Sequence, residues 1–541
     1  MGFTTPLAKP WNQIKQHYDA VVVGSGYGGG VAAFRLARAG RSVCVLERGR
    51  EFTPGEFSND WHRTLREVRL SGQRLQLGSK AGLYDFRAGR EIHVLTANGL
   101  GGGSLINGAV ALRPDPKVFE AEGWPQALRQ DGLFDVGLDR AEHMLGVSRC
   151  PNPEGLPKFL ALQRGASALG ASIEPVPTTI TYRPRTNAAD VDQPACHLCG
   201  DCWSGCNVGA KNTVPLTYLA DAARNGAEIF TLTTVRHVSK SGRQWTVQVE
   251  STIAHSNNRR YGQTSITADI VILAAGTLGS TEILLRSRER GLALSDQLGK
   301  GFSGNGDEML IGRDLDAEVN AVAVGVPPRA NVGPVGPATI AVIRYRDQDD
   351  QDATVLLQDG TMLPLMAMMA PLKAFAEFRW TRAVQLLREG RYRGYRSRAQ
   401  VYYLVTRDSA GGELRLVRDR LVVDWPDLRK DPCFERGART ARRVIEHLGG
   451  VPLNNPLSDR ILGGRKITAH PLGGCAMGED ASTGVVDNRC QVFDVSRGGI
   501  RDVHEGLYVC DGSIIRSSLG VNPLLTITAL AERSMTLLAR K

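Results

Sequence analysis

The pattern of apolar and polar positions is clearest near the start of the chain. Residues 20–23 form a short apolar run, which predicts a buried strand. Residues 31–39 follow with helix-forming side chains, and the apolar residues of "VCVLERG" predict a second strand that ends in Glu47. The pattern therefore predicts a strand, a tight turn, a helix and a second strand.

The turn between the first strand and the helix carries a G-x-G-x-x-G motif at Gly24, Gly26 and Gly29. The first glycine permits the tight turn, the second lets the backbone approach a pyrophosphate, and the third lets helix and strand pack closely. Glu47 lies about twenty residues further on, where an acid accepts hydrogen bonds from an adenosine ribose. This arrangement predicts a dinucleotide site, and the motif alone does not separate FAD from NAD.

A second apolar stretch, residues 356–372, is rich in methionine. It suits an adaptable hydrophobic substrate pocket, and it suits ordinary core packing equally well. Leu372, Phe375 and Phe378 recur at near-helical spacing, and the arginine-rich segment 388–398 follows. The arginines indicate a solvated helix and loop, with a docking site for an acidic electron-transfer partner or a membrane surface as the alternative.

Composition narrows the class of protein. The chain has 541 residues, 42% hydrophobic and 23% charged, with 61 glycines, which fits an α/β protein of more than one domain. No run of 18 apolar residues and no secretory signal occurs, so we expect a cytoplasmic protein without a transmembrane span. The net charge of +10 comes mostly from scattered arginines. Because no recognition motif accompanies them, nucleic acid is the least supported partner.

Four cysteines lie within "CHLCGDCWSGC", at Cys196, Cys199, Cys202 and Cys206. Their C-x2-C-x2-C-x3-C spacing is that of bacterial ferredoxins and favours an iron–sulfur cluster in a reducing compartment. Zinc, or a clusterless thiol or disulfide arrangement, remains an alternative. Asn207 stands where the ferredoxin run has proline, so three cysteines ligating [3Fe-4S] and four ligating [4Fe-4S] both stay open. From Asn207 the chain predicts a loop, a helix through Arg224 and a strand.

Three segments, residues 98–110, 274–287 and 470–534, resemble the flavin-contacting segments of glucose–methanol–choline (GMC) oxidoreductases, with the cholesterol-oxidase-like members most similar. The resemblance implies FAD as the cofactor. It is dissociable, because no histidine for a covalent link occurs in "TANGLGGGS". The implied cofactor-binding residues are Gly24, Gly26, Gly29, Glu47, Gly102, Gly103, Ser104, Asn107, Val235, Ala275, Gly276, Asp511, Gly512 and Asn522.

His470 and Asn522 match the histidine–asparagine pair that faces the flavin in the same members. Alcohol oxidation takes a proton from oxygen and a hydride from carbon; a histidine titrates near working pH, and an amide can hold the oxygen. Where cholesterol oxidases carry a glutamate that isomerises the steroid double bond, the nearest stretch here offers Met368 or Met369. The resemblance therefore implies oxidation, and does not extend to isomerisation.

The expected fold is α/β: a Rossmann-like FAD-binding domain and an α+β substrate domain with an antiparallel sheet. The expected parts are 15–115, 191–310 with the cysteine loop, and 456–541 for the FAD-binding domain, with 116–190 and 311–455 for the cap and substrate domain. The predicted function is oxidation of an apolar, steroid-like or terpenoid-like alcohol, with electrons leaving through the cluster to a ferredoxin-like or quinone acceptor. The alternatives are a peroxide-forming oxidase with structural cysteines, and an electron-transfer subunit.

Overall fold

A computed structural model describes most of the chain. The described residues are 5–72, 76–253, 263–328, 332–346, 354–363, 366–367, 392–455 and 464–539, with Trp380, Val384 and Ser458. Met368, Met369, the spaced Leu372, Phe375 and Phe378, and the first arginines of segment 388–398 lie outside this part. None of the described helices has the length and hydropathy that a bilayer span needs.

The first layer is an eight-stranded mixed sheet. Its strands are His17–Val23 (β1), Val43–Leu46 (β2), Glu228–Phe230 (β12), Thr233–Ser241 (β13), Gln244–Ser251 (β14), Gln263–Leu273 (β15), Gln491–Phe493 (β25) and Val503–Val509 (β26). The order is β12-β2-β1-β15-β14-β13, with β26 joined to β15 and β25 to β26. β12, β2, β1, β15 and β26 run parallel, whereas β13, β14 and β15 pair antiparallel. The predicted strands at residues 20–23 and 43–46 are confirmed.

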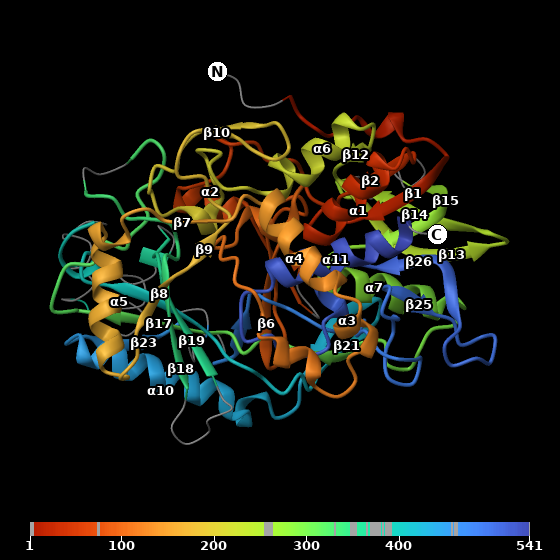
Figure 1. The fold of residues 1–541 in the computed structure, drawn as a ribbon. Helices are drawn as coiled ribbons and strands as arrows, with labels where there is room; N and C mark the ends of the chain where they lie inside the picture. Colours follow the sequence, from red (N-terminus) through yellow and green to blue (C-terminus); the bar gives the residue numbers. More distant parts are fainter. Residues whose placement is uncertain are drawn as a thin grey trace.

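Helices pack on this sheet or on one another in the right-hand half of the molecule in Figure 1. They are Tyr27–Arg38 (α1), Leu133–Met144 (α4), Tyr218–Arg224 (α6), Gly276–Glu289 (α7) and Leu524–Ala539 (α11). α1 contacts β1 and β2 below it and α6 and α11 beside it, and α11 in turn contacts α4. α1 begins four residues before the expected Val31, because Gly28, Gly29 and Gly30 are buried inside the helix rather than forming a loop.

A second layer, at the left of Figure 1, is a six-stranded antiparallel sheet with its own buried core. Its order is β23-β17-β20-β19-β18-β8, formed by Val451–Asn454, Glu308–Arg313, Gln400–Val405, Thr354–Gly360, Ala341–Arg346 and Ile173–Pro175. Helices Pro157–Ser167 (α5) and Pro432–His447 (α10) pack against it and each other. The predicted antiparallel sheet beside a Rossmann-like layer is confirmed.

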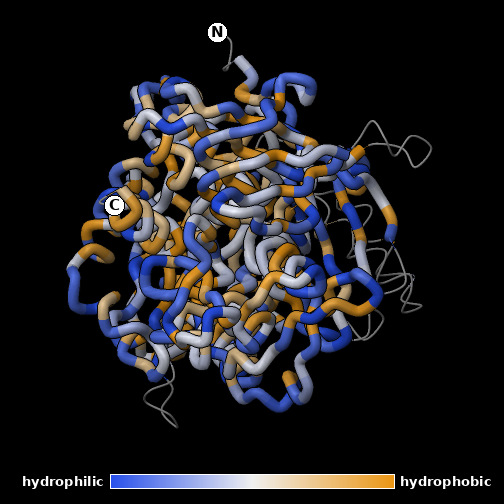
Figure 2. Tube along the Cα trace, turned by 90° about the vertical axis from the view of Figure 1, so that its right-hand side faces the viewer, coloured by the Kyte–Doolittle hydropathy of each residue, from blue (hydrophilic) through white to orange (hydrophobic). Residues whose placement is uncertain are grey.

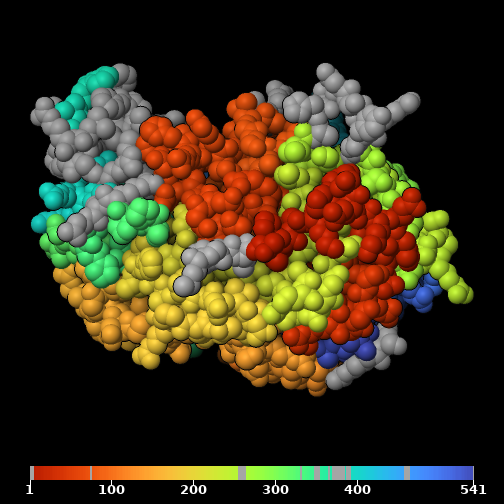
Figure 3. All heavy atoms as spheres, turned by 90° about the horizontal axis from the view of Figure 1, so that it is seen from above, coloured from red at the N-terminus to blue at the C-terminus, as the bar shows by residue number. Residues whose placement is uncertain are grey.

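A third, five-stranded sheet forms a lid between the two layers. Its order is β24-β6-β5-β3-β4, from Lys466–Thr468, Ile92–Ala97, Tyr84–Arg87, Val68–Ser71 and Gln76–Leu77. β24 pairs parallel with β6, which brings the chain just before His470 beside the N-terminal quarter of the sequence. Seen from above, this face consists mainly of the N-terminal half of the chain, with the C-terminal segments only at its edge (Figure 3).

The remaining described elements are short. They are Trp61–Arg66 (α2), Gln126–Gln130 (α3), Ser148–Arg149 (β7), Pro177–Thr178 (β9), Arg185–Thr186 (β10), Asp192–Gln193 (β11), Lys300–Phe302 (β16), Gly412–Val417 (β21) and Arg420–Asp424 (β22). Hydrophobic segments gather inside the molecule and polar segments outside it (Figure 2). Burial of these apolar side chains is the main force that holds the layers together.

Candidate active site

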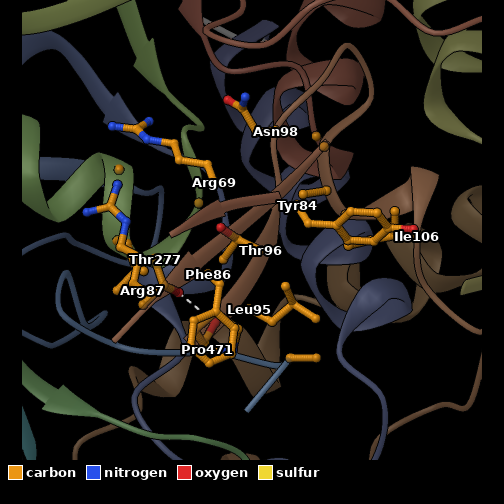
Figure 4. Close-up of a pocket in the computed structure, with 18 of the residues that line it drawn as sticks. Arg69, Tyr84, Phe86, Arg87, Leu95, Thr96, Asn98, Ile106, Thr277 and Pro471 are labelled. Carbon is orange, nitrogen blue, oxygen red and sulfur yellow. Dashed lines mark hydrogen bonds between the residues drawn. The ribbon is translucent and has the colours of Figure 1, made fainter. Parts of the chain in front are cut away.

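A cavity of about 1540 Å³ lies where the three sheets meet. Its walls come from the glycine turn after β1, the lid strands β3, β5 and β6, the start of α7 and the segments around His470 and Asn522. Figure 4 shows lid residues Arg69, Tyr84, Phe86, Arg87 and Leu95 around this space, and Thr277 donating a hydrogen bond to the carbonyl of Pro471 in its wall. The folded chain therefore brings the predicted cofactor segments to one elongated site.

The glycine turn is shaped by close backbone contacts on one side and open space on the other. A Cβ atom on Gly29 would lie 2.0 Å from the carbonyl oxygen of Gly24, so only glycine lets α1 pack this close. A Cβ on Gly26 would meet nothing within 4 Å, because Gly26 borders the cavity. Gly24 has φ +95°, which favours glycine.

Glu47 is buried at one end of the cavity. One carboxylate oxygen accepts hydrogen bonds from the Ser25 hydroxyl (2.5 Å) and backbone N–H (3.3 Å), and the other accepts from the Gly49 N–H (2.7 Å). Burial raises the pKa of Glu47, while these donors oppose the shift. Val235 of β13 also lines the cavity. Glu47 and Val235, which the sequence analysis assigns to the adenosine, therefore line the same cavity.

The loop at residues 101–107 borders the middle of the cavity. Gly102 has φ +53°, and its Cβ would lie 3.0 Å from the Cα atom of Gly26, whereas Gly103 has open space around it. Asn107 donates to the hydroxyl of Tyr27 (2.7 Å). The Ser104 hydroxyl donates to the Gly101 carbonyl and accepts from the Val214 N–H, so it braces the loop.

Asp511 joins two cofactor segments. Its carboxylate accepts hydrogen bonds from the Gly276 N–H (2.9 Å), the Ser280 hydroxyl (2.5 Å) and the Ser513 N–H (2.8 Å). Burial raises its pKa, and the same donors oppose the shift. These bonds fix the start of α7 beside Gly512, and Ala275, Gly276, Asp511 and Gly512 all line the cavity.

His470 lines the far end of the cavity and is held by an acid that the sequence analysis missed. Its Nδ1 lies 2.9 Å from Oδ1 of Asp307, whose side chain is 2% exposed. The other oxygen of Asp307 accepts from the Thr468 hydroxyl (2.9 Å) and the Ala469 N–H (3.0 Å). With a carboxylate at Nδ1, the neutral ring carries its proton there, so Nε2 is the basic nitrogen.

Asn522 is held by a second missed residue, Gln358 of β19. The amide nitrogen of Gln358 donates to Oδ1 of Asn522 (2.8 Å), and both side chains are buried against the cavity. Because its oxygen is engaged, Asn522 retains its amide N–H groups for an oxygen atom in the cavity. The same region is lined by Tyr403, whose hydroxyl lies 3.3 Å from Nδ1 of His470.

The cysteine loop borders the same cavity. All four cysteines are free thiols; Cys202 is buried and the other three are half-buried. Burial raises the pKa of Cys196 and Cys199, and the neighbouring cysteines raise both further. Trp203, inside the loop, lines the cavity and its ring lies 6.3 Å from that of Tyr403. Trp203 therefore brings the cysteine loop to the cavity wall beside Tyr403.

The cavity is lined by glycine turns along its length and by the His470 and Asn522 side chains at one end. This arrangement is typical of an oxidoreductase that binds a dinucleotide cofactor. The residues fit FAD, because Gly26, Gly103 and Gly276 leave space for a long cofactor and no side chain at these positions fills it. The GMC oxidoreductase family model matches residues 18–305, and its C-terminal part matches residues 434–531. The chain belongs to the GMC oxidoreductase family, which makes it an FAD-binding enzyme.

Two relatives are similar over nearly the whole chain, and one solved structure shares the fold. A cholesterol oxidase from Acinetobacter baumannii is 28% identical over 97% of this chain and 95% of its own. A long-chain-alcohol oxidase, FAO4B, from Arabidopsis thaliana is 28% identical over 95% of this chain and 66% of its own. The crystal structure of pyridoxine 4-oxidase from Mesorbium loti shares the fold, with a TM-score of 0.61 and 20% identity, over 97% of this chain and 99% of that one.

The missed residues differ in how visible they are in the sequence. Asp307 belongs to no segment that the sequence analysis singled out. Gln358 lies in the methionine-rich stretch 356–372, but that stretch was considered for its apolar residues and not for this amide. Lys211 is different, because it is the single charged residue between Asp201 and Asp221. A lone cation in an uncharged stretch next to four cysteines is a signal that could have been used.

Proposed function

We propose that this enzyme oxidises the hydroxyl group of an apolar, steroid-like or terpenoid-like alcohol to a carbonyl. The observation that carries the proposal is the contact between Asp307 and Nδ1 of His470, which leaves Nε2 as a base at the cavity. The names of the related cholesterol and long-chain-alcohol oxidases support an apolar alcohol.

Each residue near the cavity has a separate role in the proposed reaction. Asn522 donates an amide N–H to the substrate oxygen, and Gln358 keeps that amide turned toward the cavity. Nε2 of His470 takes the hydroxyl proton, and the Asp307 carboxylate stabilises the resulting imidazolium at Nδ1. Bound FAD supplies the hydride acceptor for the carbinol carbon. The cofactor is held by the glycine turn, Glu47, Asn107, Val235 and the Asp511 segment.

The wall near His470 supports an apolar substrate. Trp203, Met309, Leu363 and Met366 line the cavity there. Contact with these apolar side chains removes a hydrocarbon skeleton from water, which favours binding. The same side chains offer few hydrogen-bond partners to the hydroxyl groups of a sugar. We expect sterols and long-chain alcohols to reduce the flavin faster than glucose or methanol does.

The test is anaerobic mixing of the FAD-loaded enzyme with a panel of alcohols while flavin absorbance is followed. His470→Ala should slow flavin reduction by roughly 10²-fold or more, the usual contribution of a general base, with FAD content unchanged. His62→Ala, which alters an exposed histidine, serves as the matched control. An unchanged reduction rate in His470→Ala would remove His470 from the mechanism.

We propose further that electrons leave through an iron–sulfur cluster at Cys196, Cys199, Cys202 and Cys206 to a ferredoxin-like or quinone acceptor. The position of Trp203 between the cysteines and the cavity supports this route. The related proteins are named as oxidases, which favours a second candidate, direct oxidation by oxygen with peroxide formed. A peroxide assay with and without a dye acceptor separates the two.

A further inference from the structure

Lys211 is a buried cation behind the active-site wall. The residue is 1% exposed, and its Nζ donates to the carbonyl oxygens of Leu105 (2.8 Å), Asn107 (3.1 Å) and Cys202 (2.8 Å). Lys211 therefore connects the loop at residues 101–107 to the cysteine loop. Carbonyl dipoles satisfy the three N–H donors, but they do not neutralise the charge.

A second buried lysine shows how this fold neutralises such a charge elsewhere. Nζ of Lys158 lies 2.8 Å from Asp359, and both side chains are 0% exposed. Within the described part of the chain, Lys211 has no carboxylate at ion-pair distance. Its Nζ lies 2.8 Å from the carbonyl oxygen of Cys202, within the cysteine loop. A buried cation without a counterion is costly, so the cysteine loop is where an anion is needed.

The sulfur atoms are placed to accept hydrogen bonds. The Leu198 N–H donates to the sulfur of Cys196 (3.4 Å), and the Ala338 N–H donates to the sulfur of Cys202 (3.4 Å). Such donors stabilise thiolates and tune iron–sulfur clusters.

The spacing of the sulfurs argues against a single zinc ion. Four thiolates around one zinc lie roughly 3.8 Å apart, from the Zn–S distance and tetrahedral geometry. Among the described residues, no three of these cysteines have sulfurs that all lie within 4.8 Å of one another. An iron–sulfur cluster does not need the sulfurs to lie that close, because each thiolate binds a different iron atom. Gly200 (φ +81°) and Gly205 (φ +101°) allow the loop to curve around it.

We infer that Lys211 is the fixed countercharge of an anionic iron–sulfur cluster bound by Cys196, Cys199, Cys202 and Cys206. This inference rests on the proposed electron route. The four thiols lose four protons when iron and sulfide bind, and the positive charge of Lys211 favours the extra electron of the reduced cluster. Each alcohol releases two electrons, which leave one at a time to the ferredoxin-like or quinone acceptor.

The test compares wild-type protein with Lys211→Met and Lys211→Gln, all purified without oxygen. Iron, acid-labile sulfide and FAD are measured, and the cluster is titrated by EPR. Removal of the charge should shift the reduction equilibrium at least tenfold toward the oxidised cluster, about 59 mV for one electron. Lys211→Gln keeps hydrogen-bond donors without the charge, so it should shift as Lys211→Met does. Lys430→Met removes an exposed lysine as the control.

The other outcomes also decide the question. Variants that lose iron but keep FAD support the countercharge. A wild-type potential in Lys211→Gln, or loss of iron and FAD together in both variants, makes Lys211 a brace only and overturns the inference. Wild-type protein that holds zinc, or no metal, overturns it as well. Flavin reduction by an alcohol in the same preparation then shows whether the proposed oxidation stands without the cluster.

Discussion

Asp307 lies beside the ring of His470 and determines which ring nitrogen carries the proton. In Asp307→Asn an amide replaces the carboxylate, and an amide N–H directed at Nδ1 would favour the tautomer whose proton sits on Nε2. The base would then be lost, although the side chain keeps its size. We expect flavin reduction to slow by roughly 10² to 10⁴, the range for general base catalysis.

Rapid-mixing kinetics across pH would check this, together with FAD affinity. Tyr403→Phe is the matched control, because its hydroxyl contacts the same nitrogen at the longer distance of 3.3 Å. That variant should retain most of the rate. Equal losses in both variants, or a weakened FAD affinity in Asp307→Asn, would mean that Asp307 only maintains the local structure.

At this scale the sequence predicted two polar side chains that line the cavity and missed the residues that hold them in place. His470 and Asn522 stand in long segments that resemble a known family. Asp307 is 163 positions from His470, and Gln358 is 164 positions from Asn522. Partners so far apart meet only after the sheets have formed, and no local pattern marks them.

The turn between β1 and α1 uses two glycines for different purposes. Gly26→Ala adds a methyl group at the cavity, where nothing lies within 4 Å and φ is an ordinary −67°. The FAD-free protein should keep its unfolding temperature, while FAD affinity falls roughly tenfold or more, about 1.4 kcal/mol. Gly29→Ala places a methyl group 2.0 Å from the Gly24 carbonyl, and such overpacking costs about 1–3 kcal/mol or more.

Calorimetry on FAD-free protein and flavin-fluorescence titration would separate the two effects. Gly155→Ala is the control, since a Cβ there also meets nothing within 4 Å and the residue lies outside the cavity. If Gly26→Ala destabilised the FAD-free protein as much as Gly29→Ala does, the assignment of Gly26 to the cofactor would be wrong.

The same turn shows what local patterns can predict about elements. The strands at residues 20–23 and 43–46 and the helix before Arg224 are found where apolar runs and helix formers predict them. The lid sheet was not predicted, because its strands are short and its edge pair joins β24 to β6 across most of the chain. Pairing at that separation depends on tertiary packing, which outweighs local propensity.

Across the whole molecule, one buried carboxylate joins the lid to the nucleotide-binding sheet. Asp85 on β5 is 0% exposed and accepts a hydrogen bond from Arg48 (2.7 Å), just beyond β2. Arg69 and Arg87 project from neighbouring lid strands toward the same side (Figure 4). Burial alone would raise the pKa of Asp85, but Arg48, Arg87 and Arg69 outweigh it and hold the pKa below the ordinary 3.8.

The sign of the pH effect follows from this depressed pKa. The folded state binds the Asp85 proton less readily than the unfolded state, so the stabilisation is full above about pH 4 and decreases as the pH falls further. Asp85→Asn leaves the half-buried guanidinium of Arg48 without this acid, while Arg87 keeps Glu282, so we expect a cost of up to about 3 kcal/mol near pH 7. Its unfolding temperature should therefore be well below that of the wild type at pH 7.

Thermal unfolding of both proteins between pH 7 and pH 3, at one scan rate, tests the argument. The gap between the unfolding temperatures of wild type and Asp85→Asn should narrow below about pH 4. Acid protonates Asp85 in the wild type and so removes the negative charge that the variant already lacks. Asp190→Asn breaks an exposed pair with Arg224 and should cost under about 1 kcal/mol. A gap that stays constant down to pH 3 would mean that the lid is held by packing and not by this charge.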